Sequence, residues 1–301
     1  MTIVVGYSPD GRDRAALDLS AMLARSARDD MVVCTVVPAP WVPGVARIDA
    51  EYQAYLDDAA HLALDRARAD LPPDVTAAFS VHSARSAPRG LLEVAEQKDA
   101  TMIVLGSSTA GVFGHIAFGS ITDRLLHSSP FPVALAVRGF RSGAGGKVSR
   151  VTVAYGGSEQ ADDLVLAAGR VAARTGATLR VASFAVRPPP PMTTRFAIEE
   201  DQVVADWAAS MRAAAQKVLE QVDGLQAGPD PLDLVIGQGQ DWAEALEDVP
   251  WAAGEVLVVG SSSIGPVARV FLGSRATKIV RHSPVPVVVV PRAAAEELAD
   301  R

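Results

Sequence analysis

Short apolar runs alternate along the chain with longer segments in which apolar residues recur every three or four positions. Residues 2–7 form an unbroken apolar run, which is typical of a parallel strand buried on both faces. A turn signal at residues 8–11 follows, and apolar residues at positions 15, 19, 22 and 23 then predict an amphipathic helix. Further strands are predicted over 31–37, 75–81, 102–105 and 133–137, with helices over 48–69, 90–98 and around 121–126. This alternation predicts parallel strands joined by right-handed helical crossovers.

The second half of the chain repeats this order. Residues 102–108 (MIVLGSS) match residues 256–262 (VLVVGSS) at an offset of 154, and the same offset pairs Gly119-Ser120 with Gly273-Ser274. Strands are predicted over 151–155, 179–186, 232–236, 256–259 and 285–290, with a long helix over 198–222. The sequence therefore predicts an α/β protein with two doubly wound, five-stranded parallel-sheet domains in tandem, each with strand order 3-2-1-4-5. The expected boundaries are a first domain over 1–138, a glycine-containing linker over 139–149, a second domain over 150–292 and a C-terminal tail over 293–301.

A glycine-rich loop follows the fourth predicted strand of each half. In a sheet of this strand order, ligands bind at the carboxyl ends of the strands, where the order reverses between strands one and four. The loop over residues 106–120 is expected there, and it leads into a helix. Glycine lets the backbone approach a ligand closely, and a helix N-terminus favours an anion. The loop is neither a Walker loop nor a GxGxxG motif, so two interpretations stay open: a phosphate cradle, or glycines that only turn the chain.

The spacing within these loops resembles that of the universal stress protein family. Nucleotide-binding members of that family carry Gly, two residues, Gly, nine residues and then Gly-Ser. The matching positions here are Gly106, Thr109, Gly119 and Ser120 in the first half, and Gly260, Ser263, Gly273 and Ser274 in the second. The resemblance covers residues 2–138 and 150–291. It implies a site for ATP or a related adenine nucleotide in each half, with Val37 and Val186 at the ends of the second strands among the binding residues.

Two departures from the family pattern are shared by both halves. The middle glycine is replaced by Thr109 and Ser263. The aspartate that ends the first strand in ATP-binding members, and reaches the nucleoside, is replaced by Ser8 and Gly156. Asp10 lies two residues after Ser8 and substitutes for that acid only if the turn bends back. The resemblance therefore implies weak nucleotide binding.

Composition narrows the remaining function classes. The chain has 28 Lys and Arg against 35 Asp and Glu, a net charge of −7, and no basic block, so no nucleic-acid or membrane partner is expected. A single cysteine, Cys34, forms no internal disulfide, and no apolar stretch reaches the ~20 residues that span a bilayer. Residues 1–6 have no basic segment and no cleavage-like site after them, so no signal peptide is expected. The expected location is cytoplasmic. The five histidines lack metal-ligand spacing and no catalytic triad motif is present, so neither a metal nor an enzymatic activity is expected.

The leading hypothesis is a stress-response module of the universal stress protein type that binds an adenine nucleotide without turnover. The alternative hypothesis is a nucleotide-free scaffold that recruits a protein partner, and slow ATP hydrolysis is a third. The last strands, 133–137 and 285–290, are apolar edge strands that need cover. They favour an internal pseudo-dimer of the two halves, with a homodimer as a further option.

Overall fold

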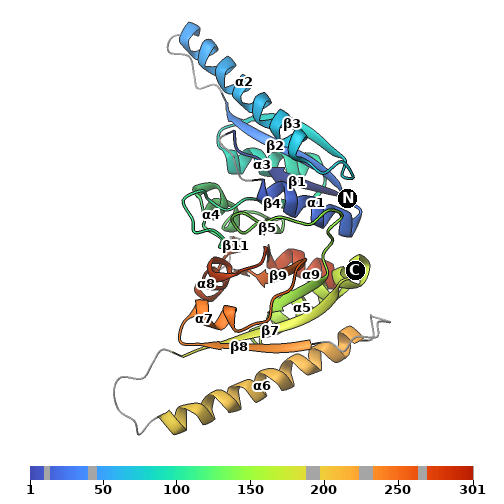
Figure 1. Cartoon of the computed structure of the whole chain (residues 1–301), viewed down its shortest axis with the longest axis vertical. Coiled ribbons are helices and arrows are strands. Elements are labelled where there is room, and N and C mark those ends of the chain that lie inside the picture. Colours follow the sequence, from blue (N-terminus) through green and yellow to red (C-terminus); the bar gives the residue numbers. More distant parts are fainter. Residues whose placement is uncertain (10–13, 40–45, 188–196, 224–232, 264–269, 301) are drawn as a thin grey trace. The chain divides into compact units, whose positions relative to one another are not determined.

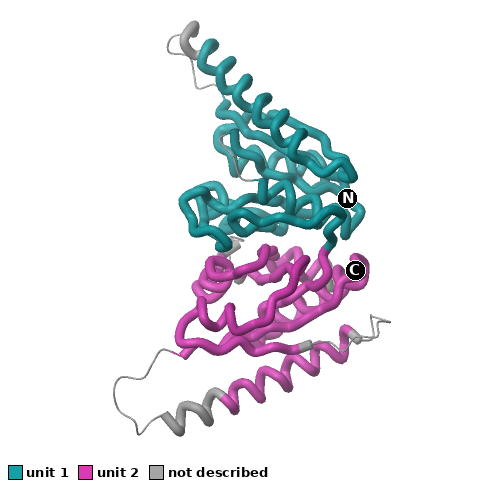
Figure 2. The backbone as a smooth tube through the Cα atoms, in the orientation of Figure 1, with its two compact units in different colours: residues 1–147 teal, residues 148–301 magenta. Residues whose placement is uncertain are grey.

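The computed structural model describes residues 1–9, 14–39, 46–187, 197–223, 233–263 and 270–300. The chain divides into two compact units, Met1–Lys147 (unit 1) and Val148–Arg301 (unit 2), which are coloured separately in Figure 2. Each unit is an α/β domain, as the hydrophobic pattern predicts.

Unit 1 contains one parallel sheet with the predicted strand order, β3-β2-β1-β4-β5 (Figure 1). Its elements are β1 (Thr2–Gly6), α1 (Ala15–Ala27), β2 (Asp30–Pro38), α2 (Ala46–Asp70), β3 (Ala77–Ala84), α3 (Ala87–Gln97), β4 (Ala100–Leu105), α4 (Ser120–Leu126) and β5 (Val133–Leu135). In the register of the central strands, Val4 of β1 lies between Val32 of β2 and Ile103 of β4. All three side chains are at most 5% exposed, which is why these strands appear in the sequence as unbroken apolar runs.

Unit 2 repeats the order as β8-β7-β6-β9-β12, again with parallel neighbours. Its elements are β6 (Arg150–Ala154), α5 (Glu159–Thr175), β7 (Thr178–Val186), α6 (Ala197–Asp223), β8 (Asp233–Gly239), α7 (Trp242–Glu247), β9 (Glu255–Gly260), β10 (Ser262–Ser263), β11 (Val270–Phe271), α8 (Ser274–His282), β12 (Val287–Val290) and α9 (Arg292–Asp300). Here α5 packs against α6, and α7 packs against α8. Right-handed crossovers place helices on one face of the sheet where the chain moves from β6 toward β8, and on the opposite face where it moves from β8 through β9 toward β12. The pair α5 and α6 therefore shares one face, and the pair α7 and α8 shares the other.

The structure adds two elements to the predicted order. The strands β10 and β11 form an antiparallel ribbon within the glycine-rich loop of unit 2. Residues 292–300 form α9, which packs against α5 with Ala295 buried, whereas the sequence analysis assigns only a tail to this segment. The third strand of unit 1 begins at Ala77 and ends at Ala84, later than the predicted range of 75–81. Among the helices described, none is long and apolar enough to cross a membrane.

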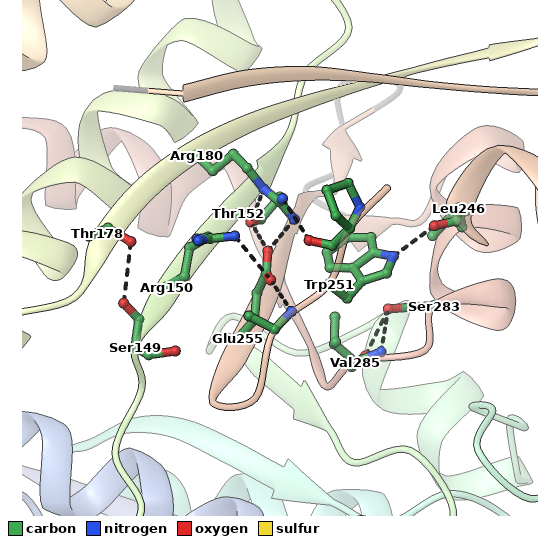
Figure 3. A network of polar contacts seen from close by, with 12 residues as sticks. Ser149, Arg150, Thr152, Thr178, Arg180, Leu246, Trp251, Glu255, Ser283 and Val285 are labelled. Carbon is green, nitrogen blue, oxygen red and sulfur yellow. Dashed lines mark hydrogen bonds and ion pairs between the residues drawn. The ribbon is translucent and has the colours of Figure 1, made fainter. Parts of the chain in front are cut away.

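A buried ionic network links three strands of unit 2 (Figure 3). Arg180 of β7 and Glu255 of β9 are each 1% exposed, and their side chains form an ion pair. Thr152 of β6 lies between them, donating its hydroxyl to Glu255 and accepting a hydrogen bond of 3.1 Å from Nε of Arg180. The remaining groups are also paired: Arg180 donates to the Pro250 carbonyl at 3.0 Å, and the second Glu255 oxygen accepts from the Ala252 amide at 2.8 Å. Removing one partner of such a pair leaves the other charge buried without compensation. The intact network is therefore expected to contribute strongly to the stability of unit 2.

Candidate functional site

A cavity of about 410 Å³ opens at the carboxyl ends of β1, β2 and β4 in unit 1. Its volume lies within the range of small-molecule pockets, and its position is the one expected for ligands of doubly wound sheets. Its walls come from the end of β1 and the turn after it, from β2, α1, α3, the loop after β4, and the first turn of α4. The lining residues are Gly6, Tyr7, Ser8, Pro9, Ala16, Cys34, Val36, Ala87, Leu91, Leu105, Gly106, Ser107, Ser108, Thr109, Gly119, Ser120, Ile121 and Thr122.

The floor of the cavity is built around the end of β1. The Tyr7 amide donates to the Cys34 carbonyl at 2.9 Å, and the buried Thr35 hydroxyl donates to the Tyr7 carbonyl at 3.0 Å. A Cβ at Gly6 would come within 2.6 Å of a methyl group of Leu105 and 3.0 Å of one of Leu91. Glycine is therefore needed there so that these two leucines close over the strand end. The result is an apolar floor with Ser8 at the rim.

The glycine-rich loop folds back through its own hydrogen bonds. The Ser108 amide donates to the Ala117 carbonyl at 2.9 Å, and the Ala117 amide donates to the Ser107 hydroxyl at 2.8 Å. The Gly114 amide donates to the Arg138 carbonyl at 3.0 Å, and the Arg138 side chain donates to the Gly111 carbonyl. These bonds return the chain to the start of α4. They place residues 107–109 and residues 119–122 around one opening.

Gly106 and Gly119 line this cavity at positions where a Cβ would fit without a clash. A Cβ on Gly106 would lie 3.8 Å from the Cβ of Ala16, and one on Gly119 would lie 3.9 Å from the Cβ of Ser108. Both distances are ordinary van der Waals contacts, and neither residue has a positive φ. The fold itself therefore does not require glycine at these two positions. Their lack of a side chain leaves room for a ligand against the backbone.

The cavity brings together five of the residues that the sequence analysis selects in the first half: Ser8, Gly106, Thr109, Gly119 and Ser120. Of the two other selected residues, Val37 does not line the cavity; it is 3% exposed, and its neighbour Val36 lines the cavity instead. Alternate side chains of a strand point to opposite faces, so a shift of one residue decides which valine meets a ligand. Asp10 lies outside the described residues.

The selected residues of the second half lie at the equivalent edge of the other sheet. Val186 and Gly260 end β7 and β9, and the exposed Gly156 follows β6. Gly273 is the N-cap residue of α8, and Ser274 is the first residue of that helix. Ser263 belongs to β10, where its backbone pairs with Val270. Residues 264–269, between β10 and β11, lie outside the described part of the chain.

Several lining residues are absent from the sequence-based selection. Ser107, Ser108 and Thr122 add hydroxyl groups, while Leu91 and Ile121 add apolar surface. The family spacing names only glycines and the residues at their positions, so it carries no information on the intervening side chains. The sequence feature that indicates hydroxyl groups in this lining is the run Ser107-Ser108-Thr109, which directly follows the fourth strand.

Cys34 lies at the bottom of the cavity and is fully buried. Burial disfavours the thiolate and raises the pKa of the Cys34 thiol to about 11. Cys34 is a free cysteine, and its environment is that of a small buried hydrophobic side chain. Within the described residues, no group of three or more His, Cys, Asp or Glu side chains is placed to hold a metal ion.

Cys34 is expected to react slowly with alkylating reagents in the native chain. At pH 8 an unfolded cysteine with a pKa near 8.5 is about one quarter thiolate, whereas a pKa of about 11 leaves about one thousandth. Alkylation by iodoacetamide, followed by intact mass, should therefore be roughly two hundred times slower in the native chain than in urea. The native rate should rise with pH up to about 11. Equal rates in the two states at pH 8 would show that Cys34 is accessible and ionised.

Comparison with known proteins was made at the level of sequence and of fold. The model of the universal stress protein family matches residues 1–138 and 147–291. A universal stress protein of Mycobacterium tuberculosis is 38% identical over 298 residues, which cover 97% of this chain and all of that protein, and one of Mycobacterium bovis matches equally well. A universal stress protein structure from Archaeoglobus fulgidus has a TM-score of 0.65 at 20% identity, covering 97% of this chain and 98% of that one. A putative universal stress protein from Pseudomonas aeruginosa has a TM-score of 0.57 at 16% identity, covering 100% and 98%.

Proposed function

The chain belongs to the universal stress protein family, and on that premise we propose that the cavity of unit 1 binds ATP or a related adenine nucleotide. The observation that supports this proposal best is that Gly106 and Gly119 line the cavity although the fold does not require glycine at either position. Glycine at such positions lets a ligand lie against backbone amides. The proposed role is a cytoplasmic stress-response module in which ligand binding, not turnover, is the functional event.

The rest of the lining suits the two ends of a nucleoside. The half-buried Val36 and the side chain of Leu91 line the cavity and offer apolar groups against which a flat base packs. Ser8 and the hydroxyl residues of the loop offer hydrogen bonds at the rim. Since Ser8 stands where ATP-binding relatives carry an acid, the contact with the nucleoside is reduced and binding is weak.

A second candidate function is recruitment of a protein partner without a nucleotide. Besides the N-terminal Met1, four large apolar side chains of the described part of unit 1 are more than 60% exposed: Tyr52 and Tyr55 on α2, and Val112 and Phe113 in the glycine-rich loop. Exposed apolar groups of this size mark interaction surfaces when they gather in a patch.

Ser8→Asp is expected to tighten ATP binding about tenfold and to leave inorganic triphosphate no tighter. Ser8 is exposed at the cavity rim, so a carboxylate there stays solvated while it accepts hydrogen bonds from a ribose. A charge-assisted hydrogen bond contributes about 1.5–3 kcal/mol, and 1.4 kcal/mol is tenfold in affinity. Isothermal titration of the full chain with both ligands measures the two changes.

Ser8→Asn is the matched control, because it has the same shape without the charge. It should give a smaller gain with ATP than Ser8→Asp gives. If Ser8→Asp leaves ATP affinity unchanged, or tightens triphosphate equally, the nucleoside does not lie beside β1 and the proposed site is wrong.

A further inference from the structure

The helix α2 of unit 1 carries two apolar stripes on different sides. The first faces β2 and β3, on which α2 packs, and its residues are at most 5% exposed: Ala60, Ala63, Leu64 and Ala67. The second, which we call the outer stripe, consists of Tyr52, Tyr55, Ala59 and Leu62. Its three large side chains are 61%, 67% and 53% exposed, in that order. A surface helix needs only its core-facing stripe, so the fold does not account for the outer one.

The outer stripe has the spacing of a contact between two helices. Its residues follow one another at intervals of three, four and three, as positions a and d do in a heptad repeat. In such a contact a side chain of one helix fits into a hole between four residues of the other. The half-buried Ala59 lies between the larger Tyr55 and Leu62 and provides a hole of this kind. The stripe is therefore shaped for a second helix and not for an extended peptide.

The second unit offers an internal comparison. Its helix α6 likewise connects the second and third strands of a sheet (Figure 1). Over residues 205–222, where the side chains of α6 are described, the exposed residues are Ala, Ser, Gln and charged residues. No large apolar side chain in that range is exposed. The outer stripe is therefore a feature of unit 1 and not a requirement of the domain architecture.

Acidic residues line one flank of the outer stripe. Glu51, Asp58 and Asp65 are exposed and recur at intervals of seven, each one residue before a position on the line of the stripe, so they lie together on one side of it. The Asp65 carboxylate pairs with Arg68 at 2.7 Å, but this pair is exposed and contributes little, so another cation can replace Arg68. The net charge of the chain, −7, adds a long-range attraction for a basic partner.

A second copy of α2 would match the spacing of the outer stripe but not its charges. In a two-fold pair of antiparallel helices, equal flanks face each other, so the acidic flank of one copy would face the acidic flank of the other. Like charges at these flanking positions oppose pairing, whereas opposite charges select the partner.

We infer that the outer stripe of α2 is the docking surface for an amphipathic helix of another protein. That helix carries apolar residues at heptad spacing, with Lys or Arg on the flank that meets Glu51, Asp58 and Asp65. The inference rests on the second candidate function, recruitment of a protein partner, and does not depend on nucleotide binding.

The probe for this surface is a synthetic peptide of three heptads with Leu at positions a and d and Lys at positions e and g. The like charges of its flanks keep it from pairing with itself. A peptide with Glu in place of every Lys is the control. Fluorescence anisotropy of each labelled peptide with the full chain should show the Lys peptide binding about tenfold more tightly or better. Equal affinities, or no binding of the Lys peptide, would overturn the inference.

Tyr52→Ala combined with Tyr55→Ala separates docking on the stripe from general attraction to an acidic protein, because all charges stay in place. This double variant should weaken binding of the Lys peptide about tenfold, since large aromatic side chains are the usual anchors of an interface. Both tyrosines are exposed and alanine favours helix, so the urea midpoint should stay near that of the wild type. His61→Ala, an exposed position of α2 outside the stripe, should leave the affinity within twofold. Equal affinities for the two variants would contradict docking on the stripe.

Asp58→Lys tests the acidic flank by itself. It should weaken binding of the Lys peptide at least threefold more than Glu247→Lys does, because Glu247 is an exposed acid of α7 in unit 2 and the change in net charge is the same. Equal effects of the two variants would show that only the net charge attracts the peptide, and would overturn the inference on the partner's basic flank.

Two further outcomes identify a different occupant or a different surface. If sedimentation of the full chain alone shows a dimer that the double tyrosine variant abolishes, a second copy occupies the stripe and the inference is wrong. If Phe113→Ser removes peptide binding while the double tyrosine variant retains it, the glycine-rich loop is the docking surface. In that case the inference on α2 is overturned, while recruitment of a partner stands as a function.

Discussion

Replacing Arg180 with Met is expected to lower the free energy of unfolding of unit 2 by about 3–5 kcal/mol, the cost of removing one partner of a buried ion pair. Glu255 would keep its hydrogen bonds from Thr152 and from the Ala252 amide, but it would lose the cation that balances its charge. Arg150, whose guanidinium lies 3.7 Å from the other Glu255 oxygen, is one-third exposed and compensates only in part.

Urea unfolding followed by tryptophan fluorescence measures this change. The centre of the Trp251 ring lies 5.2 Å from the Arg180 guanidinium carbon, so the fluorescence of this tryptophan responds to changes in the network. Arg292→Met is the control within the same unit, because the Arg292–Glu296 pair is nearly half-exposed and should unfold close to the wild-type midpoint. The double variant Arg180→Met with Glu255→Leu should recover at least half of the loss, since no charge stays buried alone. An Arg180→Met midpoint equal to that of Arg292→Met would contradict this account of the network.

Gly119→Val is expected to weaken binding of the adenine ligand by unit 1 more than tenfold without unfolding the chain. A valine side chain would enter the space between residue 119 and Ser108, where the backbone is open to the cavity. The backbone at residue 119 has φ −86° and ψ 171°, an extended conformation that β-branched residues adopt readily. The cost to the fold is the less favourable N-cap of α4, about 1 kcal/mol. Titration and urea unfolding of the same preparation separate the two effects.

Gly143→Val is the matched control for Gly119→Val. A Cβ at Gly143 meets nothing within 4 Å, and this residue lies away from the cavity lining. Its ligand affinity should equal that of the wild type. If both variants lose binding to the same degree, the loss reflects a general effect of valine and not the position of the ligand.

The fold could be predicted because its determinants are local or repeated. Unbroken apolar runs such as residues 2–5 identify buried parallel strands, and the recurrence of Gly-Ser at 119 and 273 identifies the tandem arrangement. The strand order 3-2-1-4-5 was predicted correctly for both sheets.

The features that the sequence analysis did not predict depend on which residues the fold brings together. Arg180 is visible in the sequence as a charge inside an apolar strand, but its partner Glu255 is 75 residues away, and only the sheet register brings them together. The choice between Val36 and Val37 is a matter of which face of β2 meets the cavity, a choice that the apolar run does not encode. Ile121 likewise is identified as a lining residue only once the fold places α4 at the cavity wall.

The most direct test of the proposed site is a crystal structure of the full chain grown with AMP. The account predicts electron density for one AMP in unit 1, with its base against Leu91 and Val36 and its phosphate beside the backbone of Gly106 and Gly119. An empty unit 1 cavity at saturating AMP, or density for AMP in unit 2 alone, would contradict it.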